Sequence, residues 1–208
     1  DGSGFMANYV QLHGVTSEMI DWWFVWHFIK PPSVPEGNGN LRYKIWCPEE
    51  HWDTGCTDAE SMERYIDENI PMKYKRENTS HFIDESVMGG DLIHMVSRGI
   101  NPEYMGIDRG LLERPEGGTL NAGQIMSGSP SLIAHYFRPT WFGVELRTRC
   151  WFGYTISNGK PALIEKCPNI SEKQAAGMLM HNMVEYQHLG RFLPQLYAEE
   201  SWKPLNAY

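Results

Sequence analysis

Histidine and glutamate side chains recur in this sequence at spacings that would let two of them bind one metal ion. His181 and Glu185 lie four residues apart in a segment with a helical pattern, so both side chains would leave the same face of that helix. A histidine and a carboxylate in this arrangement can share a metal ion without backbone strain. His188 would lie one turn further along that face. A polar helix face with a His–Glu hydrogen bond would show the same spacing, so the pattern alone leaves both interpretations open.

A second pair, His81 and Glu85, would share one face of a strand, because side chains alternate along a strand. Glu85 has apolar neighbours such as Ile83 and Val87, so its carboxylate would be half buried. A buried carboxylate without a partner is costly, and Glu85 should therefore contact a metal ion or a histidine. The alternative is an edge strand on which Glu85 faces solvent.

Two further histidines lie in apolar surroundings. His27 follows the aromatic run 22–26, and His135 lies within the apolar segment 132–137. A single histidine in such a place is usually a core residue with one hydrogen bond. Taken together, however, three imidazoles and two carboxylates on elements that could converge match the needs of a catalytic zinc ion. Such an ion typically takes three protein ligands and keeps one position for water.

Other chemical motifs are absent or weak. The sequence has no HExxH, no GxSxG and no glycine-rich phosphate loop after a strand. Arg147 and Arg149 alternate on one expected strand and could hold an anion, although a surface ladder of ion pairs is the more ordinary interpretation. The net charge of −8 disfavours nucleic acid and anionic membranes as partners. Four scattered cysteines without CxxC spacing are typical of reduced thiols in a cytoplasmic protein.

The elements that must position these residues indicate an α+β domain. A helix is expected from Thr16 to about Ile29, and a long final helix from Ser171, with Gln174 completing a capping box, to Gly190. Residues 47–78 are expected to form a loop with one short helix near 58–65. Strands are expected at 41–46, from 80 onward, and at 91–97, 132–137, 142–156 and 162–166, with a hairpin turn at 158–159. A curved antiparallel sheet around the long C-terminal helix, with a cavity between them, suits these elements.

Several blocks of the sequence resemble the 2,4-diacetylphloroglucinol hydrolase and phloretin hydrolase family. The blocks, in the family's order, are Gly14–Thr16, Glu18–Phe24 with His27, Arg42–Trp46, His81–Gly89 and His181–Glu185. The resemblance implies a helix-grip fold similar to START and Bet v 1 proteins, in a single catalytic domain over residues 1–208. Two departures from the family are an absent N-terminal extension and a longer segment at 47–78, which would be a loop insertion.

The resemblance further implies a zinc ion held by His27, His181 and Glu185. Glu85 and His135 would lie beside the metal as catalytic groups or extra ligands. Glu85 is preferred to the neighbouring pair at 49–50, because its flanks match the family's block. The aromatic residues expected to line the ring pocket are Trp23, Trp26, Tyr136 and Trp151.

The activity implied is hydrolysis of the carbon–carbon bond between an acyl carbonyl and a polyhydroxylated ring, on a substrate of the acylphloroglucinol or phloretin type. Ortho and para hydroxyls would let the ring carry the charge as that bond breaks. Two other functions stay open, namely a helix-grip carrier of hydrophobic ligands, which needs no metal cluster, and a zinc esterase or amidase. The sequence does not decide between a monomer and a homodimer.

Overall fold

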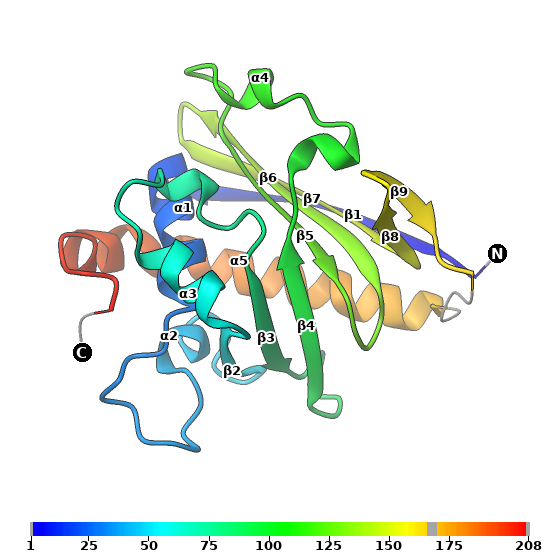
Figure 1. Ribbon diagram of the computed structural model, residues 1–208, viewed down its shortest axis with the longest axis horizontal. Coiled ribbons are helices and arrows are strands. Elements are labelled where there is room, and N and C mark those ends of the chain that lie inside the picture. Colours follow the sequence, from blue (N-terminus) through cyan, green and yellow to red (C-terminus); the bar gives the residue numbers. More distant parts are fainter. Residues whose placement is uncertain (1, 166–169, 207–208) are drawn as a thin grey trace.

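A seven-stranded antiparallel sheet curves around one long helix in the computed structural model, which describes residues 2–165 and 170–206 (Figure 1). The strand order is β1-β7-β6-β5-β4-β3-β2, so β2 to β7 follow one another as neighbours and β1 forms the edge beside β7. The strands are β1 (Gly4–His13), β2 (His51–Cys56), β3 (Ser80–Glu85), β4 (Ile93–Gly99), β5 (Thr119–Ile125), β6 (Ser131–Thr140) and β7 (Gly143–Phe152). The predicted α+β architecture is confirmed.

The remaining elements flank this sheet. The helices are α1 (Ser17–Trp26), α2 (Leu41–Lys44), α3 (Ala59–Ile66), α4 (Arg109–Leu112) and α5 (Glu172–Glu200), with short 3-10 turns η1 (Met72–Tyr74) and η2 (Pro102–Met105). A separate hairpin joins β8 (Tyr154–Ser157) and β9 (Lys160–Leu163). Its turn residues, Asn158 and Gly159, have φ values of 51° and 71°, as the predicted turn requires.

Helix α5 is the helix around which the sheet curves. The predicted capping box is present, because Ser171 Oγ accepts from the Gln174 N–H at 3.2 Å and the Gln174 side chain accepts from the Ser171 N–H at 3.0 Å. The predicted end at Gly190 is wrong, since the helix continues to Glu200. A Cβ at position 190 would lie 2.9 Å from Leu12 Cδ2. This glycine therefore permits close packing of α5 on β1 rather than ending the helix.

Helix α1 lies beside α5 and carries much of the apolar core. It begins where predicted, with Thr16 Oγ1 accepting from the Met19 N–H at 3.4 Å, and it ends at Trp26, so His27 is its C-cap. Side chains of α1, α5 and the sheet form the largest buried apolar cluster. The structure thus places His27 at the end of a helix that is buried along most of its length.

The region between α1 and β3 differs most from the prediction. The expected strand at 41–46 is wrong, because Asn40 Oδ1 accepts from the N–H groups of Arg42 and Tyr43 at 3.0 and 3.4 Å and so starts helix α2. The expected loop at 47–78 contains α3, as predicted, and also strand β2. A register shift between His51 and Asp53 interrupts the alternation of β2, and this bulge obscures the strand in the sequence.

Strands β1 and β5 were not expected from the sequence. β1 follows a regular alternation in which Met6, Val10 and Leu12 are buried while Phe5 and Tyr9 are exposed.

Within residues 2–165 and 170–206, no helix is long and apolar enough to cross a membrane. Cys47, Cys56 and Cys150 are free thiols, and the fourth cysteine lies outside the described residues.

Candidate metal centre

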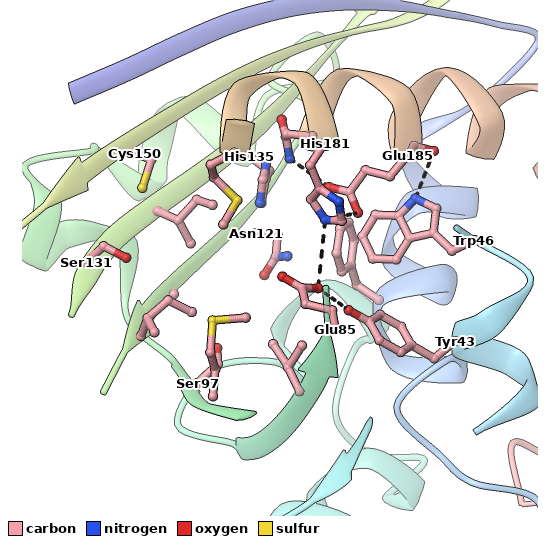
Figure 2. Close-up of a pocket in the computed structure, with 18 of the residues that line it drawn as sticks. Tyr43, Trp46, Glu85, Ser97, Asn121, Ser131, His135, Cys150, His181 and Glu185 are labelled. Atoms are coloured by element: carbon pink, nitrogen blue, oxygen red, sulfur yellow. Dashed lines mark hydrogen bonds and ion pairs between the residues drawn. The ribbon is translucent and has the colours of Figure 1, made fainter. Parts of the chain in front are cut away.

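Two histidines and two glutamates converge beneath α5, and we call these four residues the His–Glu cluster. His51 Nε2 lies 3.4 Å from Glu185 Oε2 and 3.7 Å from Glu85 Oε2. His181 Nε2 lies 3.8 Å from Glu85 Oε2 and 3.9 Å from Glu185 Oε2. All four side chains are buried. Figure 2 shows His181, Glu85 and Glu185 turned toward one another, with α5 above and the end of β3 below.

The secondary structure explains how residues so distant in sequence meet. His181 and Glu185 lie one helical turn apart on α5, as their spacing predicts. Glu85 is the last residue of β3 and His51 is the first residue of β2, and the antiparallel register places these two directly opposite each other. The cluster therefore combines a helix face with the paired ends of two strands.

The spacing within the His–Glu cluster fits one shared metal ion. Atoms about 2.0–2.2 Å from a tetrahedral zinc ion are about 3.3–3.6 Å from one another. The separations of 3.4–3.9 Å between the imidazole nitrogens and the carboxylate oxygens are close to that range. His51 Nε2 is buried and makes no hydrogen bond, although two carboxylates lie near it. A buried polar atom without a partner requires an explanation, and a metal ion between these groups would supply one.

The two glutamates are held from outside the cluster. The Tyr43 hydroxyl, on α2, donates to Glu85 Oε2 at 2.5 Å. The Asn182 side chain donates to Glu185 Oε1 at 2.8 Å, which leaves Oε2 facing the two histidines. These contacts fix which oxygen of each carboxylate points into the cluster.

The second nitrogen of each histidine is also engaged. His51 Nδ1 faces the backbone carbonyl of Tyr43 at 3.3 Å. His181 Nδ1 contacts the carboxylate of Glu50. Metal-binding histidines commonly use their second ring nitrogen in this way, because the contact fixes the tautomer and the ring orientation. Both histidines are therefore held with Nε2 directed at the carboxylates.

Burial and charge set the protonation of these groups. Burial lowers the pKa of His51 to about 4, despite the opposing effect of Glu85, so its imidazole is neutral near pH 7. Burial also lowers the pKa of His181, but the carboxylates of Glu185 and Glu85 outweigh it and raise that pKa overall. Burial raises the pKa of Glu185 to about 7. A metal ion would compete with the protons on His181 and Glu185, since ligands bind in their deprotonated forms.

Cys47 lies close to the two histidines. Cys47, His51 and His181 are buried and offer potential ligand atoms within 4.8 Å of one another, so this group could hold a metal ion. Burial raises the pKa of the Cys47 thiol to about 12, and the negative charge of the nearby Glu50 contributes a smaller part of this increase. A metal ion at this point would have to displace the thiol proton. The two glutamates of the His–Glu cluster place carboxylate oxygens 3.4–3.9 Å from the Nε2 atoms of the same two histidines, so they are the other candidate partners.

A cavity of about 140 Å³ opens beside the cluster, an order of magnitude more than one water molecule needs. Glu85, His181 and Glu185 are part of its wall. Its other walls combine apolar and polar side chains, among them Phe24, Phe28, Ile83, Met95, Ile133 and Met178, and Ser97, Asn121, Ser131 and His135. Figure 2 shows Asn121 and His135 on the sheet side of this space. The cavity thus suits a small ligand that has both apolar and polar groups.

The expected ligand His27 lies in the cavity wall but outside the cluster. Its Nδ1 contacts the Trp23 carbonyl at 2.6 Å, while Nε2 is buried without a hydrogen bond. Burial holds the pKa of His27 well below its usual value. None of the ion pairs found among the described residues includes His27. The structure brings together the expected residues His181, Glu185 and Glu85, and adds His51 to them.

His135 lies where a catalytic group would be expected, in the cavity wall. Its Nδ1 contacts Thr148 Oγ1 at 2.8 Å, and burial, with a smaller effect of the Arg76 charge, lowers its pKa to about 3. The imidazole is therefore neutral near pH 7.

The four aromatic residues expected around the ring do not line this cavity. Trp23 and Trp26 pack in the core against each other, with ring centroids 5.8 Å apart. Tyr136 and Trp151 follow His135 and Cys150 along their strands, so their side chains point to the opposite face of the sheet. Phe24 and Phe28 lie in the wall instead.

Sequence reasoning missed His51, Tyr43 and Glu50. The pair at 49–50 was considered only for its carboxylates, and His51 directly after it was not considered as a ligand. Tyr43 was assigned to a strand, although Asn40 three residues earlier is a helix-cap residue. These two signals, the adjacent histidine and the cap, were available in the sequence.

Comparison with known proteins identifies relatives of similar sequence. Phloretin hydrolase of Eubacterium ramulus is 30% identical over 204 residues, which cover 96% of this chain and 69% of that protein. A 2,4-diacetylphloroglucinol hydrolase of a Pseudomonas species is 27% identical over 201 residues, which cover 89% of this chain and 64% of that protein. The chain thus spans about two thirds of the length of these relatives.

The fold and the family are supported separately. The crystal structure of Ara h 8.0201 matches with a TM-score of 0.53 and 6% identity, over 93% of this chain and 99% of that one, which supports the helix-grip fold. The family model described as "DAPG hydrolase PhiG domain" matches residues 1–198, a range that includes the whole His–Glu cluster. The resemblance found in the sequence is confirmed by this match. The chain belongs to the DAPG hydrolase PhiG domain family.

Proposed function

We propose that this chain is the catalytic domain of a metal-dependent hydrolase that cleaves the bond between an acyl carbonyl and a polyhydroxylated aromatic ring. The observation that carries the proposal is the buried His–Glu cluster in the wall of a cavity, on a chain of this family. The names of its relatives, phloretin hydrolase and 2,4-diacetylphloroglucinol hydrolase, indicate the substrate class.

In this proposal His51, Glu85, His181 and Glu185 hold the metal ion. Two imidazoles and two carboxylates suit zinc, and the shared spacing supports a single ion. His51 thereby takes the place first expected for His27, and Glu85 acts as a ligand rather than as a proton carrier. When bound, zinc would polarise the ketone oxygen and lower the pKa of a nearby water.

The protein's own residues would orient the ring and move protons. Tyr43 holds the carboxylate of Glu85 in place through its hydroxyl. In the ligand-free protein burial keeps the imidazole of His135 in the cavity wall neutral and weakly basic. The negative charge that develops on a reacting substrate beside it would raise its pKa, and it could then take up a proton and return it. Asn121 Oδ1, also in the wall, is buried without a partner and can accept a hydrogen bond from a ring hydroxyl.

The reaction consumes one water molecule. The water oxygen ends in the carboxylic acid, the electron pair of the broken carbon–carbon bond passes to the ring, and the ring carbon takes up a proton. Hydroxyls ortho and para to the acyl group are needed, because an aryl carbanion without such stabilisation is too high in energy to leave when the carbon–carbon bond breaks near pH 7.

Product analysis with an acylphloroglucinol tests this proposal. In heavy-oxygen water the label should enter the carboxylic acid, and in deuterated water deuterium should appear at the ring carbon that lost its acyl group. The deuterium must be read promptly, because activated ring positions exchange spontaneously. The fully O-methylated ketone is the matched control and should not react, since its ring cannot carry the charge.

Three results would contradict the proposal. Cleavage of aryl esters or amides with no reaction of the ketone would indicate an esterase or amidase that uses the same cluster. Tight binding of acylphenols without any product would indicate a carrier. Equal turnover of the methylated control would rule out the ring as the electron acceptor.

A further inference from the structure

One cationic side chain in the cavity wall has no role in the function proposed above. Arg76 lies between η1 and β3 and lines the cavity on the side of α1. Its guanidinium lies 4.5 Å from the centroid of the Phe28 ring and 5.5 Å from that of Phe24, and both rings belong to the same wall. The cation therefore faces the same space as the His–Glu cluster.

This guanidinium has no acidic partner. Its Nε and Nη1 atoms are buried and make no hydrogen bond, and no ion pair among residues 2–165 and 170–206 includes Arg76. The neighbouring arginine Arg109, by contrast, pairs with Glu77 at 2.9 Å. A buried charge without a partner is costly, and proteins normally pair it or solvate it. A negatively charged group on a ligand in the cavity would balance this charge.

The groups around Arg76 do not supply that partner. Its closest charged or titratable neighbours include His27, His81 and His135, whose pKa values burial and the Arg76 charge both lower. Burial lowers the pKa of Arg76 itself, with smaller opposing effects of Tyr65 and Tyr186. The three histidines and the two tyrosines are neutral near pH 7, so none of them balances the positive charge of Arg76.

The backbone holds Arg76 firmly in this place. The Asn78 N–H donates to the Gly99 carbonyl at 2.9 Å, and the Gly99 N–H donates to the Thr79 carbonyl at 2.9 Å. A Cβ at position 99 would lie 1.8 Å from the Arg76 carbonyl oxygen, so only glycine permits this approach. The segment that carries Arg76 is thus fixed against β4 rather than free to turn the guanidinium toward solvent.

We propose that Arg76 binds an ionised phenolic oxygen of the substrate ring, away from the carbonyl that the His–Glu cluster receives. This inference rests on the proposed function, and it adds a charge-recognition residue to it. When the carbon–carbon bond breaks, its electron pair enters the ring and the negative charge spreads onto the ring oxygens. A cation already placed beside one of those oxygens stabilises that charge in a cavity of low dielectric, without reorganisation during the reaction.

The ionisation of bound phloroglucinol tests the proposal without any turnover. Phloroglucinol keeps the ring hydroxyls and lacks the acyl group, and its phenolate absorbs at longer wavelength than its phenol. Titrated in complex with the zinc-loaded protein, it should ionise at a pH about 1–3 units lower in the wild type than in Arg76→Met, the range expected for an opposite charge within contact distance. Arg76→Lys should recover part of the shift.

Arg64→Met is the matched control, because Arg64 belongs to the neighbouring α3, donates to the Tyr74 carbonyl at 2.9 Å and does not line the cavity. It should leave the ionisation of phloroglucinol unchanged. Thermal unfolding of the ligand-free protein separates a binding role from a structural one. Arg76→Met should unfold at the same temperature as the wild type or higher, since it removes an unpaired buried charge and keeps an apolar stem. A lower unfolding temperature would make Arg76 a structural residue and overturn the proposal.

Turnover gives the third measurement. Arg76→Met should lower kcat for an acylphloroglucinol by roughly 10²-fold, the loss typical of one oxyanion-stabilising group. The loss should shrink when ring fluorination makes the phenols more acidic, because such a ring needs less stabilisation. Wild-type turnover with an unaffected Arg76→Met variant would refute the role of Arg76 alone. Failure of the wild type to cleave any acylphenol would refute the proposed function.

Discussion

At the scale of single residues, the metal ligands are distinguished by which nitrogen and oxygen atoms face one another. His51 presents an unbonded Nε2 to two carboxylates, whereas the His27 ring packs against Phe28 and takes part in no ion pair found among the described residues. Both histidines are buried and neutral, so burial and pKa do not separate them. The difference lies only in the carboxylates within reach, and substitution can test it.

His51→Ala should lose most of the bound zinc, while His27→Ala should keep it. Removing His51 leaves three ligands and opens a gap in the cluster, whereas His27 contacts no carboxylate of the cluster. Metal affinity falls steeply with the number of protein ligands. Elemental analysis of the purified proteins measures the effect. Full zinc in His51→Ala together with loss from His27→Ala would restore the ligand set first expected from the sequence.

Glu50→Gln should weaken zinc binding by about 10–100-fold, the usual effect of losing an outer partner of a ligating histidine. The carboxylate of Glu50 contacts His181 Nδ1 and so orients that ring. Competition with a chelator of known affinity measures the change. Glu49→Gln is the control, because Glu49 is adjacent in sequence and exposed. Equal affinities in the two variants would show that Glu50 does not orient the ligand.

At the scale of elements, the cluster depends on how closely α5 approaches β1 and how β2 pairs with β3. Gly190 sets the first distance, because its missing side chain leaves room for Leu12. The bulge at the start of β2 sets the second, because it follows His51 at the point where His51 lies opposite Glu85. A glycine within a helix and a bulge within a strand both interrupt a regular sequence pattern. Here both help to set the positions of the residues in the His–Glu cluster.

Gly190→Ala should be less stable than Gly177→Ala by about 1–3 kcal/mol, the usual cost of overpacking a core. A Cβ at 190 would lie 2.9 Å from Leu12 Cδ2, whereas the nearest atoms to a Cβ at 177 would be Val87 Cγ1 at 3.8 Å and Met88 Cγ at 3.9 Å, which are ordinary contacts. Both changes gain the same helix propensity, so their difference isolates the packing. Urea unfolding of the two variants measures it. Equal stabilities would mean that β1 yields to the added methyl group.

At the scale of the whole molecule, the fold keeps a large set of imidazoles out of water. His27, His51, His81 and His135 are buried, and burial lowers the pKa of each, to about 4 for His51 and about 3 for His135. A histidine whose pKa is lower in the folded state than its unfolded value of about 6.5 binds fewer protons when folded. Its contribution to stability is therefore lost as the pH falls below 6.5.

The metal-free protein should accordingly lose stability between pH 7 and pH 5. Each unit by which a histidine pKa is depressed can contribute about 1.4 kcal/mol. His181 and Glu185, whose pKa values are raised, act in the opposite direction, because their contribution is lost as the pH rises. The four depressed histidines outnumber them. Urea unfolding across this pH range, with a chelator present, measures the slope, and His81→Phe should flatten it. A stability that is constant or rises toward pH 5 would contradict this reasoning.

Much of the framework follows from local sequence. The cap at Thr16, the capping box at Ser171, the turn at Asn158 and the four-residue spacing of His181 and Glu185 each involve atoms a few residues apart. Their geometry is therefore fixed by short-range sterics and hydrogen bonding, which the order of residues encodes directly. The α+β class and the half of the metal centre on α5 could be predicted for this reason.

Only the tertiary structure decided the rest of the site. His51 reaches Glu85 through a strand pairing between segments with a helix and a turn between them, and reaches Glu185 across the interior of the molecule. Whether His51 or His27 faces the carboxylates depends on a bulge, a strand register and the closeness of two elements, and none of these has a periodic signal in the sequence. The same holds for Arg76, whose lack of a partner is a property of everything that surrounds it. Such contacts join segments that are distant in the sequence and depend on the packing of the whole chain, so only the tertiary structure reveals them.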